Sequence, residues 1–178
     1  MERAPKYIIG IIIVILLRLL PHPPNVEPIT ATLMPFAKKW GILSGAVFGV
    51  LTVLVFDVIT RSIGPWSLFT AGAYALLGIF AGLYFSRVDG SRTHYVMFAV
   101  IGTLFYDAVT GLTVGPLFFD QPFMSALVGQ IPFTLYHLAG NVVLAVVLSP
   151  LIERWLIQNP KLDTSHIFWA LRLGSNTK

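Results

Sequence analysis

The chain has 178 residues, of which 56% are hydrophobic and only 11% charged. A soluble domain usually carries about 25% charged residues, so this composition indicates an integral membrane protein with one domain. The net charge of +4 fits basic residues gathered in cytoplasmic loops, and we expect no nucleic-acid partner. Because cysteine is absent, disulfides, thiolate nucleophiles and Cys-ligated metals are excluded.

The first twenty residues combine two basic side chains, Arg3 and Lys6, with an apolar run. A secretory signal would continue with a small-x-small cleavage site, but here the proline-rich segment 21–24 follows. We therefore expect a retained first helix, followed by an extended loop.

A membrane-spanning helix needs roughly 20 mostly apolar residues. On this basis we predict an all-α bundle of six transmembrane helices in a single membrane domain, residues 1–178. Of these six, the second is the weakest, because it is short and contains Pro35, and Pro132 interrupts the last. The expected spans are 6–20, 28–38, 41–61, 66–86, 94–112 and 123–153, and residues 154–178 form a cytoplasmic tail.

The distribution of basic residues indicates the orientation. With the N-terminus inside, only Arg18 and Arg61 fall in outer loops. Six spans with both termini cytoplasmic fit this asymmetry, whereas four spans would place Arg18 inside as well. The predicted inner segments hold Arg3, Lys6, Lys38, Lys39, Arg87, Arg92, Arg154, Lys161, Arg172 and Lys178.

One motif occurs twice, at Phe56–Trp66 and at Tyr106–Pro116. In each copy an acid in apolar sequence is followed by a threonine and then by Gly-Pro; the pairs are Asp57 with Thr60 and Asp107 with Thr110. Such an acid is costly in a membrane and indicates function by default. Three interpretations remain open: capping of turn amides, pairing with Arg18 or Arg61, and substrate binding. We expect Asp57, Thr60, Thr110 and Arg61 to frame a pocket.

A second set of polar residues lies within the last span. Gln130, Thr134, His137 and Asn141 have spacings of 4, 3 and 4, which place them on one helical face. Unsatisfied polar groups in hydrocarbon cost several kcal/mol each, which favours ligand contact over a purely structural role. We predict an outward-facing polar pocket whose substrate-binding residues are His137, Asn141, Gln130, Thr134, Tyr106, Asp107, Trp66, Tyr74, Asn25 and Glu27. For Trp66, an interfacial aromatic belt is the alternative.

Small residues form rows at Gly41, Gly45 and Gly49 and at Gly78 and Gly82. Such rows allow helix backbones to approach closely, and internal packing is the favoured interpretation. Contact with a partner protein is the alternative, for which the candidates are Gly10, Gly41, Gly45 and Gly49.

Motifs of catalysis are missing. The sequence contains no glycine-rich nucleotide loop, no HExxH and no nucleophile elbow, and the other histidines lack metal-ligand spacing. We therefore expect no enzyme, no cofactor and no bound metal, so that any active transport would draw its energy from another subunit.

Three stretches of the sequence stand out together: Arg18–Ala31, reading RLLPHPPNVEPITA, Asp57–Phe69, and Ala75–Leu83. In combination they resemble the S components, or substrate-specificity subunits, of energy-coupling factor (ECF) transporters. The resemblance covers roughly residues 10–155. It implies a six-helix subunit in a prokaryotic plasma membrane that binds a vitamin or similar micronutrient. Its partners would be a transmembrane coupling protein and two ATPase subunits.

Two features depart from that family. Many S components dock through Ala-x-x-x-Ala in the first helix, where this chain has only Gly10 among larger residues. The nickel and cobalt branch begins with Met-His, whereas this chain begins Met1-Glu2, so a metal substrate is not expected.

Two other functions are compatible with the sequence. A membrane scaffold similar to the rod-shape protein MreD would act through protein contacts and would have a filled outer cavity. An intramembrane aspartyl protease would use Asp57 and Asp107, since Tyr106-Asp107 resembles half of the presenilin-type signature; the GxGD half is missing.

Overall fold

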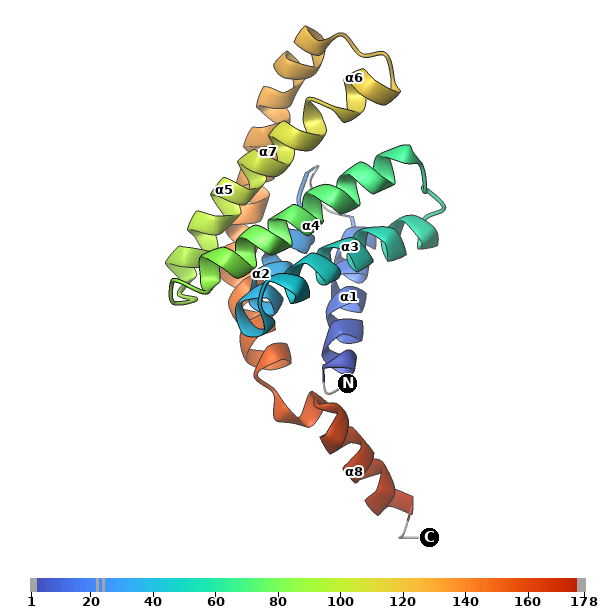
Figure 1. Cartoon of the computed structure of the whole chain (residues 1–178), viewed down its shortest axis with the longest axis vertical. Coiled ribbons are helices and arrows are strands. Elements are labelled where there is room, and N and C mark those ends of the chain that lie inside the picture. Colours follow the sequence, from blue (N-terminus) through green and yellow to red (C-terminus); the bar gives the residue numbers. More distant parts are fainter. Residues whose placement is uncertain (1–2, 22, 24, 176–178) are drawn as a thin grey trace.

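The computed structural model describes residues 3–21, 23 and 25–175. Helices account for nearly all the secondary structure of this part of the chain (Figure 1). The elements are α1 (Ala4–Leu19), α2 (Pro28–Trp40), α3 (Ile42–Ile59), α4 (Pro65–Phe85), α5 (Arg92–Gly111), α6 (Val114–Phe118), α7 (Phe123–Leu151), the π-helix η1 (Ile152–Ile157), the 3₁₀ turn η2 (Pro160–Leu162) and α8 (Thr164–Ser175).

Within the described residues, four helices are long and apolar enough to cross a membrane: Ile42–Ile59, Pro65–Phe85, Arg92–Phe118 and Phe123–Ile157. The protein is therefore a helical, multi-pass membrane protein. The two remaining predicted spans exist as helices, but α1 has 16 residues and α2 has 13. At 1.5 Å per residue they rise about 24 and 20 Å, less than the roughly 30 Å hydrocarbon core.

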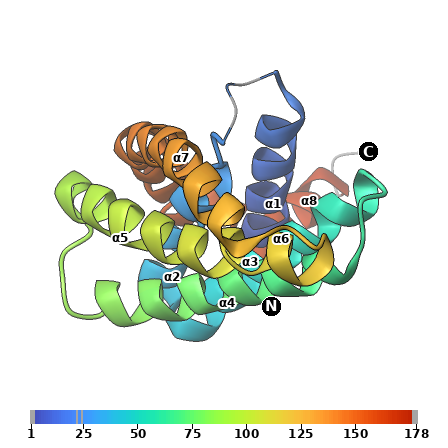
Figure 2. The same cartoon turned by 90° about the horizontal axis from the view of Figure 1, so that it is seen from above.

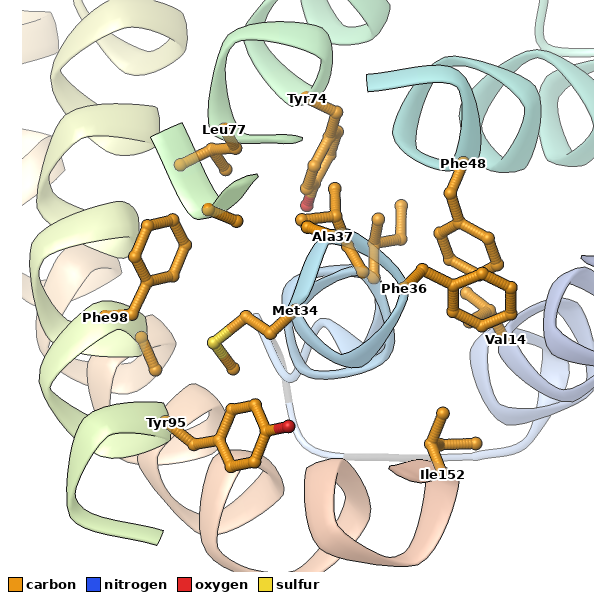
Figure 3. Packing of buried hydrophobic residues seen from close by; sticks show 14 of the residues in the cluster. Val14, Met34, Phe36, Ala37, Phe48, Tyr74, Leu77, Tyr95, Phe98 and Ile152 are labelled. Carbon is orange, nitrogen blue, oxygen red and sulfur yellow. The ribbon is translucent and has the colours of Figure 1, made fainter. Parts of the chain in front are cut away.

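The short helix α2 is the centre of the bundle. Every residue from Pro28 to Ala37 is buried. In Figure 3, Met34 and Phe36 point from α2 toward different neighbouring helices, and the Phe36 ring stacks on Phe48 of α3 with centroids 4.3 Å apart. The element with the weakest sequence signal thus occupies the core.

Pro35 does not break α2, because its missing hydrogen bond is replaced. A proline inside a helix leaves the carbonyl four residues earlier without an N–H donor. That carbonyl belongs to Ala31, and the Ser149 hydroxyl of α7 donates to it at 2.7 Å. A side chain of the neighbouring helix therefore satisfies the backbone where water is absent. Similarly, α7 continues through Pro132.

Glycines bring α3 against α4 as an antiparallel hairpin. A Cβ placed on Gly45 would lie 2.7 Å from the carbonyl oxygen of Gly78, and one on Gly49 would lie 2.8 Å from that of Tyr74. The backbones thus meet where the small residues fall. The prediction that Gly45 and Gly49 contact a partner is wrong, because this chain's own helices cover both.

The other two partner-contact candidates also have internal or local roles. Gly10 faces the rings of Phe36 and Phe48, and a Cβ placed on Gly10 would lie 2.8 Å from the nearest ring carbon of Phe36. Gly41 has a φ of 82° and forms the turn from α2 to α3, a conformation that glycine adopts without a steric penalty. Gly10 is therefore unavailable to a partner, and the structure explains Gly41 by its turn.

Several helix ends meet at one end of the bundle, which we call the basic end. It holds Arg3, Lys6, Lys38, Lys39, Arg87, Arg92, Arg154 and Lys161. Lys6 Nζ lies 2.7 Å from Asp163 and donates to the Ile157 carbonyl at 3.0 Å. Lys38 pairs with Glu153 at 2.5 Å. The predicted tail, 154–178, begins inside η1: residues 154–157 continue the helix, and Leu156 and Ile157 are buried in the bundle.

The short helix α6 lies in the connection between α5 and α7 and packs against α4; the sequence did not predict this element. Seen from above, α6 lies near the start of α4 (Figure 2). Phe118 at the end of α6 contacts Phe69 of α4, with ring centroids 5.1 Å apart, and the adjacent Phe119 contacts Trp66 at 5.7 Å.

Candidate functional site

A cavity of about 310 Å³ lies between the α1–α2 loop and helices α3, α4, α5 and α7. Five predicted substrate-binding residues line it, namely Asn25, Glu27, Tyr74, Tyr106 and His137, together with Arg18, Val26, Phe56 and Phe133. The cavity therefore draws on segments that span more than half of the sequence.

One wall is held by an ion pair between α1 and the loop. Glu27 caps α2 by accepting from the Ile29 amide at 3.3 Å, and its other oxygen lies 3.2 Å from Arg18 Nε. The Arg18 guanidinium lies over the Phe56 ring at 3.6 Å, a cation–π arrangement. One guanidinium nitrogen, Nη1, is buried and has no hydrogen-bond partner among the described residues.

The loop is fastened to α7 through Asn25. Its side-chain amide donates to the Phe133 carbonyl at 3.4 Å. Asn25 has a φ of 64°, in the left-handed region where asparagine is among the better-tolerated non-glycine residues. The residue type thus suits a turn that closes over the cavity.

Aromatic rings form the opposite wall. The Tyr74 and Tyr106 ring centroids are 4.6 Å apart, and the rings of Tyr106 and Phe133 lie nearly perpendicular to the His137 ring, with centroids 5.8 Å away in each case. Such rings offer flat apolar faces, which suit a planar ligand.

The imidazole of His137 is oriented by a buried carboxylate. His137 Nδ1 lies 2.7 Å from Asp107 Oδ1, and the two side chains are 3% and 2% exposed. His137 Nε2 and Asp107 Oδ2 are buried without a partner among the described residues. Since Asp107 engages Nδ1, Nε2 is the ring nitrogen that remains without a hydrogen bond.

Asn141 lies one helical turn beyond His137 and does not line the cavity. It is buried, and its amide donates to Thr103 of α5 at 2.7 Å, while its Oδ1 has no partner in the described part of the chain. The prediction of direct ligand contact by Asn141 therefore lacks geometric support; the residue joins α7 to α5.

Three other predicted contacts lie outside the cavity. Gln130 donates to Thr134 at 3.1 Å, and both residues line a separate groove between α5 and α7. The α7 face that carries Gln130, Thr134, His137 and Asn141 packs along the antiparallel helix α5. Of these four residues, only His137 lines the cavity. Trp66 donates to the Ser62 carbonyl at 3.1 Å and packs on Phe119, away from the cavity.

The repeated motif has one shared and one divergent feature. Thr60 and Thr110 each donate to the carbonyl four residues earlier, at 2.9 and 2.8 Å. Asp57, by contrast, is half-buried and accepts a 3.5 Å bond from Ser62 in the α3–α4 turn, whereas Asp107 is buried against His137. The two acids therefore serve different purposes.

Arg61 also belongs to the α3–α4 turn and does not line the cavity. Its φ of 57° places it in the left-handed region at the end of α3. The amides of Arg61 and Ser62 donate back to the carbonyls of Val58 and Asp57, which is a Schellman arrangement. Asp57, Thr60 and Arg61 thus hold the turn, and Thr110 stabilises the end of α5.

Phe56, Val26 and Phe133 line the cavity but were not among the predicted site residues. A signal for Phe133 was present, since it lies four residues before His137 on the same helical face. Phe56 and Val26 are apolar residues next to predicted polar ones, and only the fold distinguishes them from other apolar side chains.

Among the described residues, no group of three or more His, Asp or Glu side chains is placed to hold a metal ion. No protein-family model matches this sequence, and no curated protein or solved structure matches it either.

Proposed function

We propose that this protein is the substrate-binding membrane subunit of an ECF-type importer, and that it captures a vitamin or related small organic micronutrient. The observation that carries the proposal is the 310 Å³ cavity, whose lining residues include Arg18 and His137; in each of these side chains one buried nitrogen atom, Nη1 of Arg18 and Nε2 of His137, has no partner among the described residues. Buried polar groups of this kind are costly in apolar surroundings, and a polar ligand would satisfy them.

The lining indicates the ligand's chemistry. Flat rings from Tyr74, Tyr106, Phe56 and Phe133 favour a planar ring system. Arg18 donates hydrogen bonds only, so it favours a carboxylate or carbonyl on the ligand, and His137 Nε2 favours a second polar group. A planar heterocycle with a carbonyl or carboxylate substituent fits both.

The same cavity supports ligand binding over the MreD-like scaffold, for which a filled interior was expected. The protease alternative gains no support, because Asp57 accepts from Ser62 while Asp107 contacts His137. A catalytic carboxylate dyad would require two acids facing one another.

The proposed orientation has the basic end in the cytoplasm of a prokaryotic cell, with six crossings and both termini inside. In it, α1 and α2 are the two shorter crossings, and the α1–α2 loop and the cavity face outward. The cysteine-free sequence makes the test simple. In intact cells a membrane-impermeant maleimide should label Arg61→Cys and spare Lys161→Cys, and the reverse pattern would overturn the orientation.

Ligand binding can be tested directly. The protein is purified in detergent, and mass spectrometry identifies any small molecule that is released on denaturation. The released compound is then added to the wild type and to His137→Leu, and the thermal shift is measured. Gln130→Leu is a matched control because Gln130 lies on the same face of α7 but outside the cavity.

His137→Leu could unfold the bundle, so a second variant is needed. Asn25→Gly keeps the left-handed backbone and removes the amide that holds the loop on Phe133. We expect both cavity variants to weaken binding at least tenfold while Gln130→Leu binds normally. Unchanged affinity in both cavity variants would contradict the site, and a wild type that carries no ligand and gains no stability from a vitamin panel would contradict the function.

The proposed partners, a transmembrane coupling protein and two ATPase subunits, would supply the energy. A tagged chain solubilised mildly from its native membranes should copurify with ATPase activity. Isolation of the chain alone, under conditions that preserve other importers, would argue against this assembly.

A further inference from the structure

Two hollows adjoin one another at the basic end. The first, of about 530 Å³, is a basin lined by Arg3, Lys6, Lys39, Trp40 and Asp163 together with Ile157, Gln158 and Pro160. The second, of about 700 Å³, is a groove between α1 and α3 that is lined mainly by Tyr7, Ile8, Ile11, Val47 and Leu51. Arg3 lines both hollows, so the basin and the groove form one continuous surface.

The basin carries basic charge that no ion pair among the described residues neutralises. Lys6 is 4% exposed, and it already pairs with Asp163 and donates to the Ile157 carbonyl. Asp163, the acid that lines the basin, is therefore already paired with Lys6. Arg3 and Lys39 make no ion pair with any described residue, and Glu2 lies outside the described part of the chain. These two cations remain to attract an anion.

The groove is apolar and open. Ile8, Val47 and Leu51 are 58%, 39% and 39% exposed, and in a membrane that exposure faces lipid. Tyr7, its one aromatic member, turns its hydroxyl inward to Ser44 and stacks on Trp40 with centroids 5.8 Å apart. The groove thus offers hydrocarbon contacts, and it begins beside the basic and aromatic residues of the basin. Trp, Lys and Arg are residues that usually lie near membrane–water interfaces.

We propose that this surface is a binding site for one anionic phospholipid. The phosphate lies in the basin between Arg3 and Lys39, and an acyl chain follows the groove between α1 and α3. Basic pockets between transmembrane helices bind anionic headgroups in this way, because guanidinium and ammonium groups combine charge with hydrogen bonds to phosphate oxygens. The site is separate from the cavity and does not depend on the proposed transport function.

The test compares phosphatidylglycerol with phosphatidylcholine. The purified protein is titrated with each lipid in detergent, and retained lipid is counted by native mass spectrometry. We expect a preference for phosphatidylglycerol that falls about fivefold with Arg3→Gln and again with Lys39→Gln. Arg87→Gln and Arg92→Gln are matched controls, because these residues share the basic end but line neither hollow.

The groove is tested separately. Val47→Trp fills it and should reduce retention of phosphatidylglycerol, whereas Ile101→Trp, at an exposed position on α5, should not. Equal retention of both lipids, or equal losses in the basin variants and their controls, would overturn the proposal. Glycerol 3-phosphate competing as strongly as the lipid would assign the basin to a soluble anion and would overturn it too.

Discussion

His137 Nδ1 and Asp107 Oδ1 lie 2.7 Å apart between α7 and α5, and both side chains are almost wholly buried. Neither residue could be paired with the other from sequence, because 29 residues separate them. The contact distinguishes the two repeated acids. Asp107 orients His137, which lines the cavity, whereas Asp57 accepts a hydrogen bond within a turn.

Breaking this pair from either side should be costly. Removing one partner of a buried pair leaves an uncompensated polar or charged group, which typically costs about 3–5 kcal/mol. We expect His137→Ala and Asp107→Ala each to destabilise the protein strongly, and the double variant to lose less than the sum. The coupling should be about 0.5–3 kcal/mol.

The measurement is the free energy of unfolding in mixed detergent micelles. His137→Ala combined with Ser149→Ala is the control, since these residues are about 18 Å apart along α7 and their effects should add. Full additivity in the His137–Asp107 cycle would show that the contact contributes nothing to stability.

A second prediction concerns the Ser149 hydroxyl, the donor that replaces the hydrogen bond lost at Pro35. Ser149→Ala leaves the Ala31 carbonyl buried without a donor, which costs about 1–3 kcal/mol. In a Pro35→Ala background the residue-35 amide can bond that carbonyl, so the same substitution should cost clearly less. Ser86→Ala, at an exposed position near the end of α4, should stay within about 0.5 kcal/mol of wild type. An equal loss in both backgrounds would contradict the compensation.

Much of the fold was predictable, because long apolar runs are bounded by Pro, Gly and charge. The range 66–86 corresponds to α4 at Pro65–Phe85, and 123–153 to α7 and the start of η1. The central position of α2 was not predictable. Its length and Pro35 made it look weak, and the compensating Ser149 lies 114 residues away.

The site was predicted in part. Among the residues that the predicted topology and helical spacing grouped together, Tyr74, Tyr106 and His137 line one cavity with Asn25 and Glu27 of the loop. Spacing alone placed Gln130 and Thr134 on the same face as His137, but it does not reveal where along that face a cavity lies. The position of the cavity along the face depends on helix–helix contacts such as that of Gly111 with Gln130.

The hairpin of α3 and α4 gives a third prediction. A Cβ on Gly78 would lie 2.2 Å from the backbone carbon of Gly45, so no rotamer change can relieve the overlap. We expect Gly78→Ala to cost about 1–3 kcal/mol as the helices separate. Gly72→Ala, on the same helix with no atom within 4 Å of the added carbon, should be neutral or stabilising. Thermal unfolding of both variants in detergent provides the measurement, and equal melting temperatures would contradict this account of the interface.

A fourth prediction uses the left-handed backbone of Arg61. This conformation costs a residue with a Cβ roughly 1–2 kcal/mol, and the Schellman arrangement at a helix end normally takes glycine. Arg61→Gly relieves that strain, although glycine gains entropy in the unfolded chain. We therefore expect a net stabilisation of about 1 kcal/mol, seen as a higher melting temperature.

Arg61→Ala is the control, because it removes the same side chain but keeps the Cβ. If Arg61→Ala stabilised the protein as much as Arg61→Gly, the gain would come from loss of the arginine side chain and not from the backbone. Ligand affinity should be unchanged in both variants, because Arg61 does not line the cavity.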